Sequence, residues 1–317
     1  MNSSLKEKRR AQILDGARVA EEIKREVADD VQRLSREHNV RPRLAVIQVG
    51  DDPASTVYVR SKVRTSEELG LLSERHALKS ETTTDELLEL VSALNGRADV
   101  DGILVQLPLP RGVREQQVIE AIDPAKDVDG FHPMNVGRLA LGQRVLAPCT
   151  PAGIIELLER SGVPIRGAHA VIVGRSQIVG RPVAQMLLQR DATVTICHSR
   201  TRELASITRQ ADILIAAIGR AAFIRGEHVK PGATVIDVGI NKVTDAEAAR
   251  AFFGDEAEKR LEIIARRGST LVGDVHPAEA DEVAGRRTPV PGGVGLLTVA
   301  MLMRNTVDAA LRRRGLS

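Results

Sequence analysis

The stretch AVIVGRSQIVGRP, residues 170–182, decides the fold class of this chain. Its apolar start, 170–173, predicts a buried parallel strand, and the glycines after it predict a turn into a helix. Gly174, Ser176 and Gly180 stand where backbone comes close to phosphate oxygens, and free amides at a helix start favour an anion. The spacing is GxSxxxG and not GxGxxG, so an ordinary strand–turn–helix connection is an open alternative. The stretch predicts a turn that binds a dinucleotide.

The next strand sharpens the cofactor prediction. A chain that uses NAD usually carries an acid about twenty residues after the turn, for the ribose 2′-hydroxyl. Here the strand TVTIC, 193–197, is followed by Ser199 and Arg200, and no carboxylate stands there. Arg175 inside the turn adds a second cation, and a guanidinium fork suits a 2′-phosphate. NADP is therefore favoured over NAD, unless Arg175, Arg181 and Arg200 are only solvated surface charges.

Composition limits the class of protein. With 317 residues, 43% of them hydrophobic, and a net charge of +3, we expect a soluble globular chain with room for two domains. The balance of 45 basic to 42 acidic residues, with one tyrosine and no tryptophan, does not indicate a nucleic-acid partner. Cys149 and Cys197 lack metal-ligand spacing, so we expect neither a metal site nor a disulfide framework.

The N-terminal sequence does not predict a signal peptide. MNSSLKEKRR is charged, and it continues into AQILDG and not into an apolar core, which argues against a signal peptide. No run approaches the length of a membrane span. We therefore expect a cytoplasmic protein with a loose N-terminal tail and no membrane partner.

Apolar periodicity predicts alternating helices and strands, and hence an α/β fold with two domains. We expect the first domain, 1–146, to be an α/β unit completed by the C-terminal helix 297–317. The second domain, 147–296, is a Rossmann-type parallel sheet. The elements predicted in the first half are a helix with an apolar stripe over 19–34, strands 44–50 and 102–110, helices 55–69 and 84–94, and a loop over 124–142. Those predicted in the second half are a helix at 154–160, strands 170–173, 193–197, 212–219 and 234–241, an amphipathic surface helix within 244–268, and a long apolar helix after PVPGG.

The first domain contains one pair of residues suited to chemistry. Tyr58, the only tyrosine, precedes Lys62 by four residues on a predicted helix, so the two share a face. The ring could stack on a planar ligand while the amine transfers protons beside it. A helical lysine between Arg60 and Arg64 is more often solvated, and Tyr-x-x-x-Lys of short-chain dehydrogenases follows the dinucleotide turn, whereas here it precedes it. The pair therefore needs support from elsewhere in the chain.

The order of eight sequence blocks supplies that support. The blocks resemble those of the bifunctional methylenetetrahydrofolate dehydrogenase/methenyltetrahydrofolate cyclohydrolase family, and the likeness runs from about Ile13 to Thr306. The resemblance implies a folate held in the cleft between an N-terminal catalytic domain and a Rossmann domain that binds NADP, in a chain that is commonly a homodimer. The blocks are DDPASTVYVRSK, DGILVQLPLP, PAKDVDGFHPMNVGRL, PCTPAG, VGRSQIVGRPVAQML, DVGIN, GDV and TPVPGGVG.

The resemblance also implies roles for single residues. Lys62 would be the catalytic lysine, Tyr58 the ring stacked on the folate, and Gln106 the partner that tunes the lysine. Asp129 would hold the pterin edge, since a carboxylate accepts two hydrogen bonds; read alone, it could be an ordinary turn aspartate. The implied folate-side wall is Pro289, Pro291, Gly292 and Gly293, although a tight turn would explain them too. On the cofactor side the resemblance implies Gly174, Arg175, Ser176, Ser199 and Ile240.

The implied function has two steps, oxidation of 5,10-methylenetetrahydrofolate with NADP and hydrolysis of the methenyl product to 10-formyltetrahydrofolate. Two departures from the family pattern bear on it: Leu296 and Leu297 replace the usual Pro-Met after PGGVG, and the connection between Asn241 and Gly273 is longer than usual. Two alternatives stay open. One is a monofunctional dehydrogenase that uses NAD or NADP, and the other is a non-catalytic sensor of folate or nucleotide.

Overall fold

A computed structural model describes residues 10–316 and divides the chain into two compact units. Unit 1 comprises the segment up to Val19 together with Gly153–Leu297, and unit 2 comprises Ala20–Ala152 together with the segment from Thr298. The boundaries expected at 146/147 and 296/297 stay predictions, because a domain is defined by independent folding and not by compactness alone.

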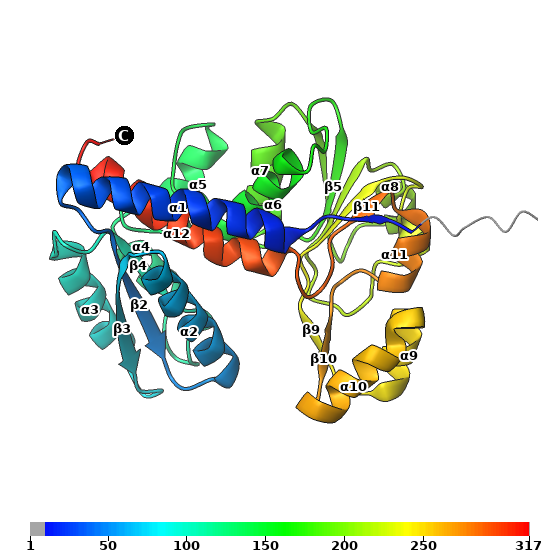
Figure 1. Cartoon of the computed structure of the whole chain (residues 1–317), viewed down its shortest axis with the longest axis horizontal. Helices are drawn as coiled ribbons and strands as arrows, with labels where there is room; N and C mark the ends of the chain where they lie inside the picture. Colours follow the sequence, from blue (N-terminus) through cyan, green and yellow to red (C-terminus); the bar gives the residue numbers. More distant parts are fainter. Residues whose placement is uncertain (1–9, 317) are drawn as a thin grey trace, which may run out of the picture. The chain divides into compact units, whose positions relative to one another are not determined.

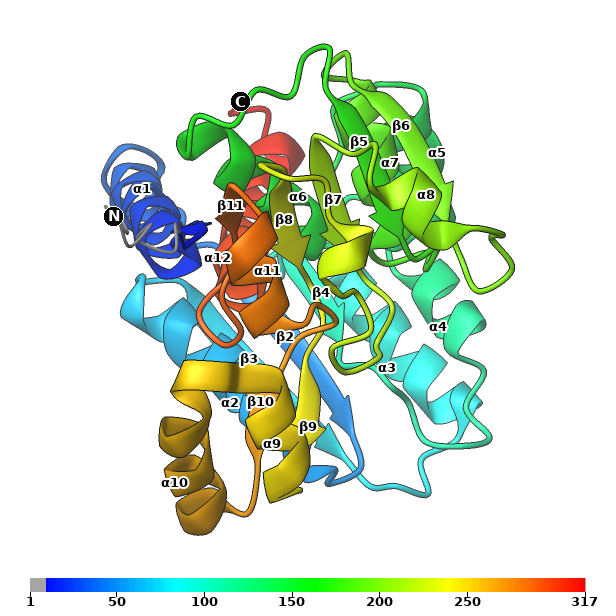
Figure 2. The same cartoon turned by 90° about the vertical axis from the view of Figure 1, so that its right-hand side faces the viewer.

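Unit 1 is built on a six-stranded sheet in which every neighbouring pair is parallel (Figure 2). The strand order is β1-β11-β8-β7-β5-β6. From β5 the chain goes first to β6 on one side and then to β7 on the other, so the order reverses at β5. Parallel sheets bind ligands at such a reversal, outside the carboxyl ends of the strands. The strands are β1 (Gln12–Ile13), β5 (His169–Val173), β6 (Thr193–Cys197), β7 (Ile213–Ala216), β8 (Thr234–Asp237) and β11 (Arg286–Arg287).

The central strands of this sheet are apolar throughout. β5, β7 and β8 are almost wholly buried, as expected of parallel strands covered on both faces. The elements that complete the body of unit 1 are α6 (Cys149–Arg160), which begins in unit 2, α7 (Gly180–Leu188), α8 (Leu204–Thr208), η1 (Gly226–His228) and α11 (Pro277–Val283). The predicted Rossmann-type parallel sheet is thereby confirmed.

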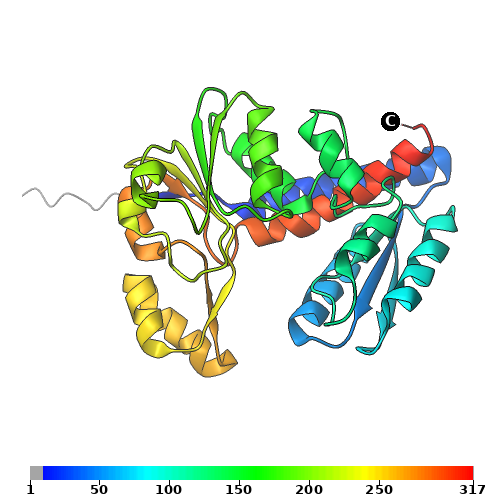
Figure 3. The same ribbon diagram turned by 180° about the vertical axis from the view of Figure 1, so that it is seen from behind.

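The long connection after β8 forms a small substructure of unit 1. It contains an antiparallel pair, β9 (Asn241–Val243) and β10 (Thr270–Val272), and between them α9 (Ala246–Phe253), η2 (Gly254–Glu256) and α10 (Ala257–Arg267). The two helices lie beside the strand pair (Figures 1 and 3). One surface helix was expected here. The helix breaks at Gly254, whose φ of +51° is not helical.

Unit 2 is built on a three-stranded parallel sheet with the order β3-β2-β4. The central strand β2 (Arg43–Val49) is apolar and buried, whereas the edge strand β3 (Leu72–Leu78) is polar and half exposed. The other elements are α2 (Pro53–Glu68), α3 (Thr84–Gly96), β4 (Gly102–Val105), α4 (Glu115–Ala121) and α5 (Pro133–Ala140). Two expectations were wrong here. The strand expected over 102–110 ends at Val105 and turns before two prolines, and the expected loop 124–142 contains α5, which starts at Pro133 with His132 as its cap.

Two long helices complete unit 2. α1 (Gly16–His38) and α12 (Val294–Arg313) lie side by side along most of their length (Figures 1 and 3), and Arg304 of α12 pairs with Glu26 and Asp30 of α1 at 2.8 Å each. The C-terminal helix thus returns to the first domain, as predicted. α12 also has the length and composition to cross a membrane, contrary to the expectation from sequence, but 61% of its most apolar window is buried inside the protein, as in a core helix.

Candidate active site

Lys62 and Gln106 meet at the carboxyl edge of the three-stranded sheet. Lys62 lies on α2, whose start is fixed by the Asp52 carboxylate accepting from the Ser55 amide at 2.8 Å. Gln106 follows β4 directly. Lys62 Nζ donates to Gln106 Oε1 at 3.0 Å, and Gln106 Nε2 donates to the Leu107 carbonyl at 2.7 Å. The second bond turns the amide oxygen toward the lysine, so Gln106 acts as an acceptor that holds the ammonium group.

Tyr58 lies one helical turn before Lys62 on the same face of α2. Its side chain is 43% exposed, which is high for an aromatic residue. A solvent-facing ring next to a hydrogen-bonded lysine can still cover the face of a planar ligand. The structure therefore places the predicted stacking residue and the predicted catalytic lysine together.

Asp129 carries a perturbed carboxyl group in the same unit. The segment before it runs beside β4, because Ile103 donates to the Lys126 carbonyl at 2.8 Å. Burial raises the pKa of Asp129 to about 6; the charge of Lys62 opposes that rise, and the nearby Asp127 adds to it. In the described part of the chain no residue donates a hydrogen bond to the Asp129 carboxylate. Its two oxygens are therefore available as acceptors for a ligand.

Residues not expected from the sequence fix the backbone around Asp129. Asn305 of α12 donates to the Val128 and Ala147 carbonyls at 2.8 and 2.9 Å, and it is almost fully buried. Lys126 is 1% exposed, and its ammonium group donates to three carbonyls at the end of α3, at 2.6 to 3.0 Å. A polar residue in the apolar helix α12 was the available signal for Asn305, since buried amides need partners.

The turn after β5 approaches its neighbours too closely for any side chain. Gly174 has a φ of +135°, and a Cβ atom there would lie 2.1 Å from the Ala217 carbonyl oxygen after β7. A Cβ on Gly180 would lie 2.2 Å from the Gly174 oxygen. These two glycines let strand, turn and helix close upon one another at the point where the strand order reverses. The backbone around them fits a dinucleotide.

The cation-bearing residues of the predicted cofactor set lie at the same edge. β5 and β6 are in register at Val173 and Cys197, so Arg175 and Arg200 follow adjacent strands. Arg175, Ser199 and Arg200 are exposed. One detail qualifies the expectation of free amides at the helix start: Ser176 Oγ accepts from the amides of Val179 and Gly180 at 3.1 and 3.2 Å.

The motifs DVGIN and GDV interlock through two aspartates whose role the sequence did not reveal. Asp237 accepts from the amides of Asp274 and Val275 at 2.8 and 3.0 Å, and burial raises its pKa to about 7. The Asp274 carboxylate accepts hydrogen bonds from three successive backbone amides, 218–220, including that of Gly219 at 2.9 Å. It thereby holds the loop after β7. Asp237 and Asp274 therefore have a structural role, and they fasten both ends of the segment 241–273.

The predicted folate-side wall Pro289–Gly293 lies in unit 1. Gly292 has a φ of +104°, and a Cβ on Gly293 would lie 2.6 Å from the Pro289 oxygen, so the turn is tight. Ile240 lies close to the start of α12: its Cδ1 atom is 3.5 Å from the position that a Cβ atom on Gly295 would take. Of the two leucines that depart from the family pattern, Leu297 is buried and Leu296 is 45% exposed.

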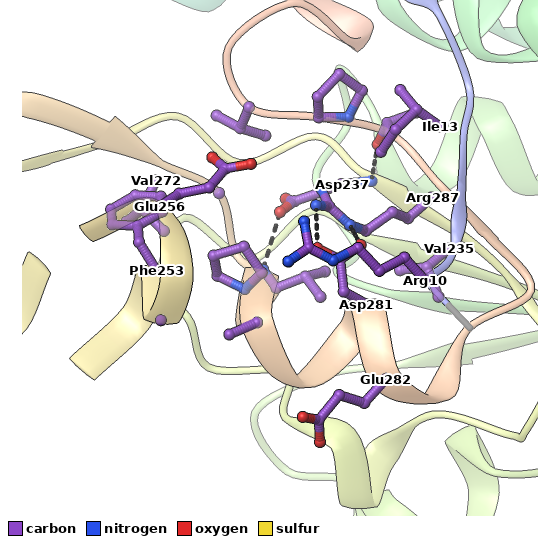
Figure 4. Close-up of a pocket in the computed structure, with 18 of the residues that line it drawn as sticks. Arg10, Ile13, Val235, Asp237, Phe253, Glu256, Val272, Asp281, Glu282 and Arg287 are labelled. Atoms are coloured by element: carbon purple, nitrogen blue, oxygen red, sulfur yellow. Dashed lines mark hydrogen bonds and ion pairs between the residues drawn. The ribbon is translucent and has the colours of Figure 1, made fainter. Parts of the chain in front are cut away.

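A cavity of about 860 Å³ lies between the inserted helices and the segment that leads to α12 (Figure 4). Phe253 and Glu256 line one side of it, and Asp281 and Arg287, which are paired through two hydrogen bonds, line the other. Pro289 and Val290 also contribute to its wall. Gly174 and the other residues of the predicted cofactor turn do not line it, so size alone does not identify the cofactor site. Within residues 10–316 no group of three His, Cys, Asp or Glu side chains could hold a metal ion.

Comparison with known proteins matches both parts of the chain. Residues 14–129 match the catalytic domain of tetrahydrofolate dehydrogenase/cyclohydrolase, and residues 148–314 match its NAD(P)-binding domain. The chain is 56% identical over 305 residues to the bifunctional protein FolD of Koribacter versatilis, covering 96% of this chain and 98% of that protein. It is 53% identical to the FolD protein of Moorella thermoacetica, covering 95% and 99%.

Solved structures agree with these matches. The FolD dehydrogenase/cyclohydrolase of Campylobacter jejuni superposes with a TM-score of 0.86 at 42% identity, covering 96% of this chain and 99% of that one. The Trypanosoma brucei FolD, solved with NADP cofactor and inhibitor, superposes with a TM-score of 0.85 at 37% identity, covering 96% and 98%. With both domains matched and close relatives aligned over nearly their full length, this chain belongs to the tetrahydrofolate dehydrogenase/cyclohydrolase family.

Proposed function

We infer that the chain is a bifunctional enzyme that oxidises 5,10-methylenetetrahydrofolate to 5,10-methenyltetrahydrofolate with NADP and hydrolyses that product to 10-formyltetrahydrofolate. The observation that carries this inference is the Lys62–Gln106 hydrogen bond of 3.0 Å, in the unit where Asp129 presents an open, perturbed carboxyl group. A held amine for proton transfer and an acceptor pair for the substrate are what a site for both steps needs.

The oxidation asks little of protein side chains. The methylene carbon lies between two nitrogens whose lone pairs stabilise the cation that forms, so no enzyme base has to remove a proton. The nicotinamide cofactor supplies the hydride acceptor when it is bound. The work left to the protein is orientation, for which we propose Tyr58 as the stacking surface and Asp129 as the group that holds the pterin edge.

The hydrolysis asks more. Water must lose a proton as it attacks the methenyl carbon, and a ring nitrogen must gain one as it leaves. We propose that Lys62 moves these protons and that Gln106 keeps Nζ in place through its amide oxygen. Because the oxidation needs no such proton transfer, loss of Lys62 should abolish the hydrolysis more strongly than the oxidation.

We propose that Gly174, Ser176 and Gly180 seat the pyrophosphate and that Ile240 contacts the cofactor. Arg175, Ser199 and Arg200 would bind the 2′-phosphate, since they follow adjacent strands at one sheet edge and are exposed. No carboxylate stands among residues 198–200 to favour an unphosphorylated ribose. NADP is therefore the expected coenzyme.

The test is turnover of methylenetetrahydrofolate with NADP and, separately, with NAD, followed by hydrolysis of methenyltetrahydrofolate by the same preparation, each monitored by absorbance. Activity in both assays, with NADP preferred, is the expected result. Oxidation without hydrolysis would replace the inference by the monofunctional dehydrogenase. Tight folate binding without turnover would replace it by the sensor.

We further propose, on the family resemblance, that the protein is a cytoplasmic homodimer. Light scattering after size exclusion should give twice the mass of the chain, and a monomer mass at assay concentration would contradict the dimer. Fractionation of expressing cells should recover the protein with cytoplasmic markers.

A further inference from the structure

The helices α9 and α10 form a small apolar core together with the strand pair β9–β10 and Ala222 of the loop after β7. Phe253 and Ala257 are buried within it, against Val243 and Val272 of the strand pair. A connection that only joined two strands would not need a core. The flanking strands β9 and β10 are already paired with each other, and the Asp274 amide donates to Asp237 at the two ends of the segment. The contacts that α9 and α10 make with the rest of unit 1 therefore indicate their role.

One side chain of these helices reaches the predicted folate-side wall. Arg260 of α10 donates from Nη2 to the Val290 carbonyl at 3.2 Å. Its guanidinium carbon lies 4.4 Å from the centre of the Phe253 ring, and Glu256 lies 3.8 Å away on the preceding turn. The ring and the carboxylate thus fix the direction of the arginine from its own helix pair.

Burying the charged side chain of Arg260 is unfavourable, so its contact with Val290 is a specific feature of the fold. Its side chain is only 14% exposed, and its Nε has no hydrogen-bond partner within the described residues. Burial lowers the pKa of the guanidinium. A long cationic side chain without such a partner usually keeps its charged group in water. The hydrogen bond to the Val290 carbonyl partly offsets the loss of hydration at this buried position.

The segment that receives this bond has few other means of attachment. Up to Thr288 the chain is tied to β8, since Thr288 donates to the Val235 carbonyl at 3.1 Å and its hydroxyl accepts from the Asp237 amide at 2.8 Å. Beyond it, Pro289 and Pro291 have no N–H to donate. Pro289, Val290 and Arg260 all line the 860 Å³ cavity, and the Arg260 bond is made to the Val290 carbonyl within this lining.

We propose that Arg260 is a positioning residue for the folate-side segment Pro289–Gly293, and that the inserted helices 246–267 serve this substrate site as a brace. The proposal rests on the proposed function in one respect, that Pro289–Gly293 faces the folate. It makes Arg260 a determinant of folate affinity although the residue itself lies outside the reacting groups.

The experiment compares Arg260→Met, which keeps the aliphatic stem and removes the donors, with Arg266→Met, an exposed residue on the last turn of the same helix. Hydrogen exchange of the peptide covering Val290 to Val294 is measured in the full-length apoprotein, together with KM and kcat for methylenetetrahydrofolate and KM for NADP. We expect faster exchange and a folate KM raised by about five- to tenfold in Arg260→Met, from the loss of a charged donor, with the NADP KM unchanged. Arg266→Met should behave as wild type.

The outcomes separate the two claims. Exchange at 290–294 equal to wild type in Arg260→Met would overturn the brace. Faster exchange with an unchanged folate KM would keep the brace and overturn the assignment of Pro289–Gly293 to the folate. If Arg260→Met does not fold, Arg260→Gln replaces it, since its side chain stays polar but is too short to reach the Val290 carbonyl; exchange in that variant equal to wild type would again overturn the brace.

Discussion

At the carboxyl edge of the three-stranded sheet, Lys62 already donates to Gln106 and the pKa of Asp129 is already raised. At the carboxyl edge of the six-stranded sheet, the polar side chains of Arg175 and Arg200 are exposed, and the tight contacts are made by glycine backbone. The first edge is organised through side chains that bond to one another. Around the turn after β5, the second edge is organised through the space that the glycines leave, whereas Asp237 and Asp274 hold the loops after β7 and β8 through side-chain hydrogen bonds.

The difference follows from what each edge is proposed to do. Proton transfer depends on the position and charge of a few atoms, so these must be held before the substrate arrives. A pyrophosphate is bound by backbone amides and by shape, and the cations around it can close on the ligand once it is present. Substitutions at the first edge should therefore change rates, and those at the second should change cofactor affinity and stability.

The largest effect is expected from Lys62→Met. Removing the proposed proton carrier should lower cyclohydrolase kcat by about 10²- to 10⁴-fold, while folate binding and NADP affinity stay near wild type. The measurement is hydrolysis of methenyltetrahydrofolate, with folate affinity from equilibrium titration. Arg64→Met is the matched control, because Arg64 lies on the same helix, is exposed and pairs with Glu68. Near-normal hydrolysis in Lys62→Met would remove this lysine from the mechanism.

A smaller effect, at the other edge, is expected from Gly174→Ala. The new Cβ would meet the Ala217 oxygen, and an L-residue would be strained at a φ of +135°. We expect the NADP KM to rise at least about tenfold and the free energy of unfolding to fall by about 1–3 kcal/mol. Gly232→Ala is the control, since Gly232 also has a positive φ but its Cβ would have nothing within 4 Å. Equal losses in both variants would mean that backbone strain, and not the close approach, sets the requirement for glycine.

The sequence predicted local patterns well and long-range partners poorly. The strand–turn–helix at Gly174 was readable because its signals are adjacent in the chain. β3 was missed because an exposed edge strand such as LSERHAL lacks the apolar alternation that identifies strands. The interlocked Asp237 and Asp274 were missed because each looks like a turn residue until the fold brings them together, 37 positions apart.

The same limit applies to the candidate site. Lys62, Gln106 and Asp129 were found through resemblance, and the Lys62–Gln106 bond then joined residues 44 positions apart. Nothing near Asp129 in sequence points to Asn305, which holds the neighbouring carbonyl from 177 positions away. Arg260 was hidden in the same way, as one more charge on an amphipathic helix. Hydrogen bonds between residues distant in sequence determine these roles, and the periodicity of the sequence does not predict such bonds.

The smallest effect is expected from the charge of Asp129 in the free protein. It sharpens the comparison because Asp237, the carboxyl group with a raised pKa at the cofactor edge, already accepts backbone amides, whereas no described residue donates to Asp129. Its folded pKa of about 6 lies above the ordinary value of 3.8, so the carboxyl group contributes stability that is complete below about pH 3.8 and is lost as pH rises through about 6. Asp129→Asn should therefore gain stability relative to wild type between pH 4 and pH 7, by about 1–3 kcal/mol in denaturant unfolding. Asp51→Asn, an exposed aspartate of the same unit, should show no such change. A difference between Asp129→Asn and wild type that is independent of pH would mean that the carboxylate is solvated in the free protein, and would remove the argument that it waits there for a pterin.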